Sequence, residues 1–196
     1  MLSLLLILHW KHGEAYPLHN TTDNATCTLR HPCSSTLMFQ IRSQLRYLSR
    51  SANDLFTVYN RAQGEPVTTQ GEKLRDHVFM NSPAFHYSGP EKDKMVDLYH
   101  VITYFRSALN DVMDCQKTLN PNAEDLHRQL RTTANMMWGL LSNVLCGLCE
   151  KYNVRPEDTM NGLSVLGKDC LLQKQLGSQL LMNYVQVIRE VAQAFQ

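Results

Sequence analysis

The sequence lacks a strong net charge of either sign, because its 19 lysines and arginines are nearly balanced by 18 aspartates and glutamates. The formal net charge is +1. This balance gives no reason to expect binding to nucleic acid or insertion into an anionic membrane surface. Internal repeats, low-complexity tracts and the alternating pattern of a β-strand are also absent. The 196 residues are enough for one domain with a substantial core.

Motifs of catalysis and metal binding are missing as well. The sequence contains no Gly-x-Ser-x-Gly, no phosphate-binding glycine loop and no His-Glu-x-x-His. Its eight histidines are scattered without the spacing of metal ligands, and they are expected to be surface or hydrogen-bonded residues. We therefore expect a protein that is not an enzyme and that needs neither a metal nor a cofactor.

The apolar run at residues 2–8 is far shorter than a membrane span, and it has the length of a signal-peptide core. Gly13 and Ala15 supply small residues at positions −3 and −1 of a cut after Ala15. No basic residue precedes the run, which leaves the true start of the leader open, and a buried N-terminal strand or helix is the alternative. We expect a signal peptide at 1–15 and a single secreted domain at 16–196.

Two glycosylation sequons follow this leader, at Asn20-Thr21-Thr22 and Asn24-Ala25-Thr26. Sequons also arise by chance, but two together in a polar stretch after a leader favour a glycosylated extracellular protein. An extracellular compartment in turn favours disulfides among the six cysteines.

The cysteine spacing fits disulfides better than a metal or redox centre. Cys146-x2-Cys149 could be half of a zinc site, but Cys27-x5-Cys33 is wider than the usual second pair, and no pair of suitably spaced histidines completes it. A thioredoxin-like centre needs a βαβ unit, which this sequence does not contain. We therefore expect structural disulfides.

Four stretches carry apolar residues at three- and four-residue steps, which is the pattern of a helix with one buried face. Asn120 and Pro121 are expected to cap and open the third helix. Long segments with glycine and proline, at about 64–90 and 153–167, follow the first and third helices. The helices are expected at about 35–62, 90–118, 121–151 and 168–194.

The loop lengths predict an all-α, long-chain four-helix bundle with up-up-down-down topology. A short connection makes helices two and three antiparallel, whereas two long crossover loops let the other consecutive helices run parallel. In that bundle Cys27 and Cys33 share one end with Cys146 and Cys149. In an up-down-up-down bundle they would lie about 40 Å apart, beyond the reach of a disulfide.

Cys115 lies near the end of the second helix and Cys170 near the start of the fourth. These two positions also share an end of the up-up-down-down bundle, so we expect the two cysteines to pair. Many pairings of six cysteines are possible, and the residues alone leave the partners of the other four open.

Two helix faces carry no charge at positions away from the core. Low charge together with an exposed methionine and tyrosine is typical of the centre of a protein interface, and a glycine inside a helix permits close approach at a cost of about 1 kcal/mol. A merely polar face, or one covered by a crossover loop, is the alternative. These positions are Gln40, Ser43, Gln44 and Tyr47 on the first helix, and Thr132, Asn135, Met136, Gly139, Ser142 and Asn143 on the third.

Segments spread over almost the whole chain carry a family resemblance. They include Arg30-His-Pro-Cys33, Gln40-Ile-Arg-Ser-Gln-Leu45, Leu140-Leu-Ser-Asn-Val-Leu-Cys146 and Ala192-Gln-Ala-Phe195. On these segments the chain resembles the leukemia inhibitory factor branch of the interleukin-6 family of cytokines. The resemblance implies a secreted monomer that works without a cofactor by bringing two receptor chains together.

The resemblance further implies the disulfides Cys27–Cys149 and Cys33–Cys146. It also implies that one surface, on helices one and three, binds the shared glycoprotein-130 receptor chain through the uncharged faces. The matching positions here are Gln40, Ser43, Tyr47, Asn135, Met136, Gly139 and Ser142.

A second implied surface, at the start of helix four, binds the leukemia inhibitory factor receptor through a Phe-x-x-Lys motif. This chain keeps the lysine as Lys174 but has Leu171 in place of the phenylalanine. Loss of an aromatic anchor can cost about 1 kcal/mol or more, so weaker binding is expected unless the receptor pocket has changed too. A third family disulfide is absent, because its positions hold Arg75 and Ser178.

The function implied by the resemblance is therefore receptor-driven JAK/STAT-type signalling in growth and differentiation. The alternative comes from a different class, namely a secreted helical bundle that acts as a carrier or structural protein with a cavity between its helices.

Overall fold

The computed structural model describes residue 27 and residues 32–64, 83–156 and 170–196, without the side chains of residues 171–173 and 175. Four helices and no strand are present in this described part of the chain. The helices are α1 (Leu37–Ala62), α3 (Glu91–Leu119), α4 (Glu124–Tyr152) and α5 (Cys170–Ala194). The predicted signal peptide, both sequons and most of the two crossover segments lie outside the described residues.

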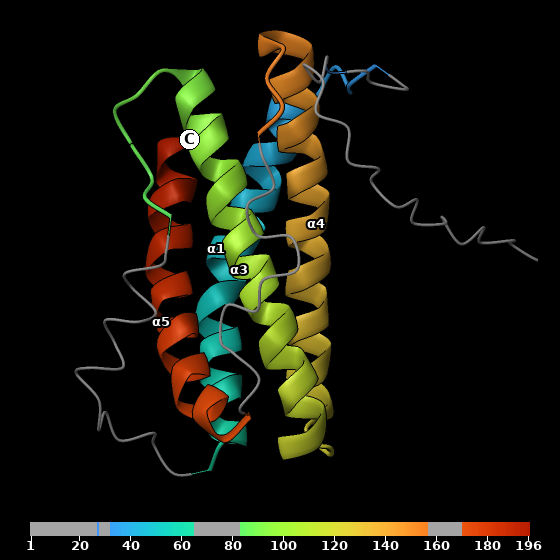
Figure 1. The fold of residues 1–196 in the computed structure, drawn as a ribbon, viewed down its shortest axis with the longest axis vertical. Helices are drawn as coiled ribbons and strands as arrows, with labels where there is room; N and C mark the ends of the chain where they lie inside the picture. The colour runs from blue at the N-terminus through green and yellow to red at the C-terminus, as the bar shows by residue number, and fades with distance from the viewer. Residues whose placement is uncertain (1–26, 28–31, 65–82, 157–169) are drawn as a thin grey trace, which may run out of the picture.

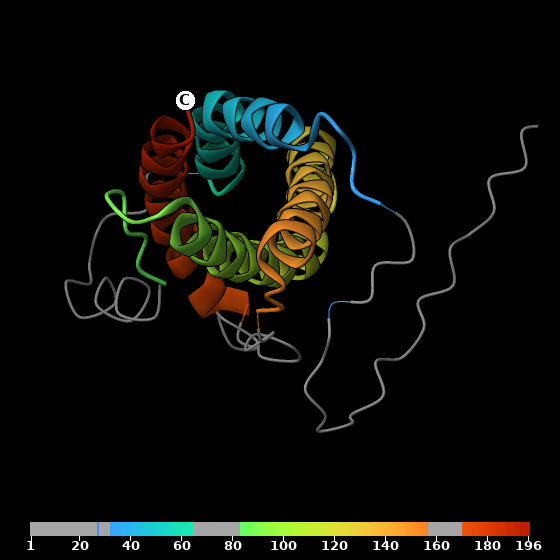
Figure 2. The ribbon, with the colours of Figure 1, turned by 90° about the horizontal axis from the view of Figure 1, so that it is seen from above.

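The direction of the helices confirms the predicted bundle class. In Figure 1, α1 and α3 run downward along the chain, whereas α4 and α5 run upward. Seen along the bundle in Figure 2, the helices stand at the corners of a square. Among the described residues α1 packs against α4 and α5, and α3 packs against the same two helices, so α1 and α3 stand on one diagonal.

The apolar stripes of the four helices meet in one continuous core. On α1 the stripe repeats at three- and four-residue steps, as the sequence predicted, and each member is at most 1% exposed. Aromatic rings fill the middle, where the centroid of Phe105 lies 5.3 Å from those of both Tyr104 and Tyr184. The α1 stripe consists of Ile41, Leu45, Leu48, Ala52, Leu55 and Tyr59.

The largest difference in helix bounds from the prediction is at the third helix, which was expected to start at 121 but starts at Glu124. Asn120 does not cap this helix, because its backbone N–H donates to the carbonyl of Gln116 at 2.9 Å and so closes α3. Ala123 then donates to the carbonyl of Asn120 at 3.1 Å. Asn120 is thus the last residue whose backbone N–H bonds to α3. Its capping propensity alone does not show which of the two neighbouring helices it ends or begins.

Three disulfides fasten the two ends of the bundle. Cys27 pairs with Cys149 and Cys33 with Cys146, with Cα–Cα distances of 5.2 and 5.9 Å, and both tie the approach to α1 to the end of α4. At the opposite end Cys115 pairs with Cys170 across a Cα–Cα distance of 5.3 Å. This third bridge joins the end of α3 to the first residue of α5, so it holds the start of α5 in place.

Candidate functional site

The uncharged residues of α1 and α4 come together because these two helices are packed neighbours. Tyr47 is 44% exposed, and the serine and asparagine side chains of the set are exposed as well. Met136 and Gly139 are half-buried, which places them at the seam between the helices. The two halves of the predicted set therefore form parts of one surface, which we call the α1–α4 face and which consists of Gln40, Ser43, Tyr47, Asn135, Met136, Gly139 and Ser142.

The seam of this face is closed by a hydrogen bond between two amides. Asn143 Nδ2 donates to Gln44 Oε1 at 2.9 Å, and the Gln44 side chain passes directly over Gly139. A Cβ atom at position 139 would lie 3.0 Å from Gln44 Nε2, tighter than ordinary contact. Gly139 thus has a packing reason inside the bundle in addition to any role in admitting a partner. The sequence pattern alone did not show this reason.

Gln40 has a different environment from the rest of the face. Its Nε2 lies 3.4 Å from the hydroxyl of Ser34 and 3.5 Å from that of Thr36, and it can donate to both. These contacts hold the Gln40 amide against the start of α1. Its side chain is half-buried there, so it offers a partner less surface than Ser43 or Tyr47.

A hollow of about 190 Å³ opens beside Tyr47, between α1 and α4. Its polar walls include Thr133, which is only 4% exposed, and the hydroxyl of Ser51. The sequence reasoning missed these two residues because neither falls on the most exposed positions of its helix. The full lining is Tyr47, Ser51, Asp54, Arg128, Gln129, Thr132 and Thr133.

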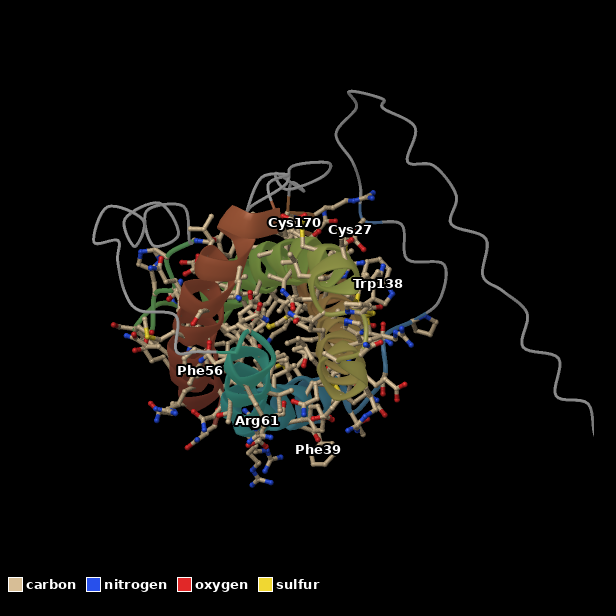
Figure 3. The ribbon with its side chains drawn as sticks, turned by 90° about the horizontal axis from the view of Figure 1, so that it is seen from below. Cys27, Phe39, Phe56, Arg61, Trp138 and Cys170 are labelled. Atoms are coloured by element: carbon tan, nitrogen blue, oxygen red, sulfur yellow. A yellow bond between two sulfur atoms is a disulfide. The ribbon has the colours of Figure 1, made fainter. Side chains whose placement is uncertain are left out.

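Trp138 is a further exposed residue of α4 that the sequence reasoning did not select. Its side chain is 60% exposed and points away from the bundle in Figure 3. The guanidinium carbon of Arg106, on α3, lies 4.4 Å from its ring centroid, a cation–π contact. Trp138 lies one turn from Ser142, so the α1–α4 face has a large aromatic residue on the flank nearer α3.

The start of α5 is held by contacts to α1 as well as by the Cys115–Cys170 bridge. The hydroxyl of Tyr59 donates to the carbonyl oxygen of Lys174 at 3.1 Å. A Cβ atom at Gly177 would overlap that same hydroxyl, so a glycine is needed for the close approach of the two helices. Burial raises the pKa of Tyr59, which keeps its hydroxyl protonated and able to donate.

Ser178 occupies one of the two positions at which the family resemblance implies a disulfide that this chain lacks. Its Oγ donates to Oδ1 of Asn60 at 2.8 Å, linking α5 to α1. The other position of that family disulfide, Arg75, lies outside the described residues, and so does the side chain of Leu171. Lys174 is half-buried in the first turns of α5.

A sequence model of the LIF / OSM family, which covers leukemia inhibitory factor and oncostatin M, matches residues 36–195. The chain belongs to the LIF / OSM family. The match begins just before α1 and ends near the last residue of α5, so it includes both surfaces described above.

Membership of the LIF / OSM family makes this protein a cytokine of the interleukin-6 type, from a family of signalling proteins rather than enzymes. In the described part of this family member, no group of three or more histidine, cysteine, aspartate or glutamate side chains could hold a metal ion. The described helices include none that is long and apolar enough to cross a bilayer.

Proposed function

We propose that the protein is a secreted cytokine that brings the shared glycoprotein-130 chain and the leukemia inhibitory factor receptor together, and so triggers JAK/STAT-type signalling. The observation that carries the proposal is the uncharged α1–α4 face. Seven candidate residues from two distant segments of the chain belong to a pair of packed helices. Surfaces with few charges and an exposed aromatic side chain, here Tyr47, are suited to the centre of a protein interface.

The geometry of the bundle allows two receptors to bind at once. The second surface, at the start of α5 around Leu171 and Lys174, belongs to a helix on the diagonal from α4. Among the described residues α4 and α5 make no direct packing contact, because α1 and α3 stand between them. Two receptor chains can therefore approach different sides of one rigid body, which sets their separation.

The rigidity of the helical bundle comes from its three disulfides. The two disulfides at one end fix α1 against α4, and the Cys115–Cys170 bridge fixes the first residue of α5. A surface that is already in its bound geometry loses less entropy on binding, so the same contacts yield a higher affinity. This arrangement supports a function by geometry and affinity alone.

The decisive experiment for the α1–α4 face uses Gly139→Arg, with Thr118→Arg as the matched control. Thr118 is exposed near the end of α3, so the control adds the same side chain and charge away from the face. We expect Gly139→Arg to weaken binding to soluble glycoprotein-130 at least about 10-fold, or about 1.4 kcal/mol, and Thr118→Arg to leave it unchanged. Binding that is absent in the unmodified protein, or insensitive to Gly139→Arg, would favour the carrier or structural alternative.

The second surface has its own test. Leu171→Phe restores the aromatic anchor of the family motif, and Lys174→Ala removes its charge. We expect the first variant to bind the leukemia inhibitory factor receptor more tightly and the second more weakly, with glycoprotein-130 binding unchanged in both. If neither variant alters receptor binding, the start of α5 is not the receptor surface of this chain.

A further inference from the structure

The outer side of α1 carries a row of arginines, which we call the arginine ridge and define as Arg42, Arg46, Arg50 and Arg61. All four side chains are exposed. Each four-residue step advances about 6 Å along a helix and turns by only about 40°, so the whole ridge extends over about 28 Å on one side of α1. Figure 3 shows Arg61 and Phe39, from opposite ends of α1, both pointing away from the bundle on this side.

The charge of this helix differs sharply from that of the chain. Helix α1 contains four arginines and a single carboxylate, Asp54, so its formal charge is +3. The formal net charge of the whole chain is only +1. Four carboxylates of the described residues form ion pairs elsewhere, with His86, Lys117, Arg128 and Lys151 as their partners. No ion pair among the described residues includes an arginine of the ridge.

The three closely spaced arginines have no structural reason within the described bundle, whereas Arg61, in the last turn of α1, is favoured by the helix dipole. Like charges four residues apart destabilise a helix, and the single carboxylate of α1, Asp54, lies one turn after Arg50 and leaves Arg42 and Arg46 without an offsetting charge on α1. The ridge is also not a by-product of core packing, because the core stripe of α1 lies on the opposite side. A partner that supplies negative charge along the same line would relieve the repulsion.

We propose that the arginine ridge binds an extended sulfated polysaccharide of the extracellular matrix. Arginine pairs with oxyanions through two parallel hydrogen bonds, and a linear polyanion can follow a ridge whose guanidinium groups stand at successive four-residue steps from Arg42 to Arg50. A shallow hollow of about 400 Å³ beside Arg46 and Arg50 gives room for a sulfate group next to the ridge. Its lining also includes Ser43, Tyr47 and Ser51, together with one carboxylate, Asp54, which lies one turn after Arg50.

Two other polyanions fit the ridge less well. All six cysteines are paired, which indicates an oxidising compartment, where nucleic acid is not the usual polyanion. A helix that lies on a membrane needs a whole apolar face turned outward, whereas the apolar face of α1 is buried in the core. On α1, Phe39 and Tyr47 are the exposed large hydrophobic side chains, too few to form such a face.

The test is affinity for immobilised heparin, measured on the secreted, disulfide-bonded protein without any receptor, so it is independent of the receptor proposal. The ridge variant is Arg42→Gln, Arg46→Gln and Arg50→Gln together. The matched control is Lys92→Gln, Arg155→Gln and Arg189→Gln together, which removes the same charge from exposed positions scattered over the other helices and their ends. Circular dichroism verifies that both variants are folded.

We expect the unmodified protein and the control to bind heparin at about 0.15 M salt, and the ridge variant to bind at least 10-fold more weakly. The dependence of log affinity on log salt should become shallower by about 2 for the ridge variant, because fewer counterions are displaced. Equal losses in the two variants would show a net-charge effect and overturn the proposal. So would an unmodified protein that fails to bind heparin, or one that binds phosphatidylserine vesicles as tightly as heparin through the same arginines.

Discussion

The single disulfide at the α5 end should contribute more to stability than either of the two bridges at the other end. Cys115–Cys170 closes a loop of 55 residues, and no other bridge shortens that loop. In the chain-entropy description, a loop of this length corresponds to about 4.2 kcal/mol of stabilisation. Removing this bridge by Cys115→Ala with Cys170→Ala is therefore expected to lower the free energy of unfolding by about 4 kcal/mol.

The other two bridges are partly redundant, although their loops are longer. Cys33–Cys146 spans 113 residues, which alone corresponds to about 4.8 kcal/mol. With Cys27–Cys149 intact, however, the effective loop consists only of the steps from 27 to 33 and from 146 to 149, about nine residues in all. Its closure is then worth about 2.6 kcal/mol, so Cys33→Ala with Cys146→Ala should cost less than removal of the α5 bridge.

Guanidinium unfolding followed by circular dichroism measures both losses. We expect the difference between the two double variants to be about 1.5 kcal/mol, the α5 variant being less stable. Cys115 is only 7% exposed, so its replacement could also alter packing. Repeating the comparison with all disulfides reduced isolates that packing effect, because the unmodified protein then lacks the bridge too. A Cys33–Cys146 variant that loses as much stability as the α5 variant would refute the reasoning.

Three other outcomes follow from the core and the α5 contacts. Gly177→Ala should destabilise the protein by about 1–3 kcal/mol in thermal unfolding despite the better helix propensity of alanine, and adding Tyr59→Phe, which removes the overlapping hydroxyl, should recover part of that loss. Ser178→Ala removes a hydrogen bond to α1 and should cost about 1 kcal/mol. Burial raises the pKa of Tyr104 to about 12, and burial with a hydrogen bond to a glutamate raises the pKa of Tyr87 to about 12, both from 10. The folded state keeps these protons longer than the unfolded state, so stability present below pH 10 should be lost as the pH rises from 10 to 12, and absorbance titration should show both tyrosines ionising late.

The helices could be predicted from the sequence because their apolar residues recur over many turns. One residue that departs from the pattern therefore does not hide the helical period. Their direction was also predictable, since the 64–90 and 153–167 segments are long while the connection near Asn120 is short. The ends of the helices were less certain. Asn120 could serve either neighbouring helix, and only the folded turn shows its N–H bonded back to Gln116.

The candidate site was predictable as a face but not as a set of contacts. Uncharged residues at helical spacing on two helices indicate a surface, and the bundle topology puts the two halves together. The individual contacts depend on side-chain conformations that are set only when the helices pack. Two examples are the Gln44 amide over Gly139 and the Gln40 amide that contacts Ser34. Hollows such as the one at Thr133 likewise arise from the join between helices, which no single segment encodes.

Net charge is a poor guide to what a surface of this protein can bind. A value of +1 argued against a polyanionic partner, because it averages all the charges of the chain. The fold separates them: α3 and α4 carry nearly balanced charges, while the arginines of α1 lie on one outer side and enter no ion pair within the described part of the chain. Attraction between exposed charges fades over about 8 Å at physiological salt, so a partner on the ridge responds to the charge of α1 and hardly to that of the far helices. The charge that matters is the local one, and it follows from the helical spacing of Arg42, Arg46 and Arg50.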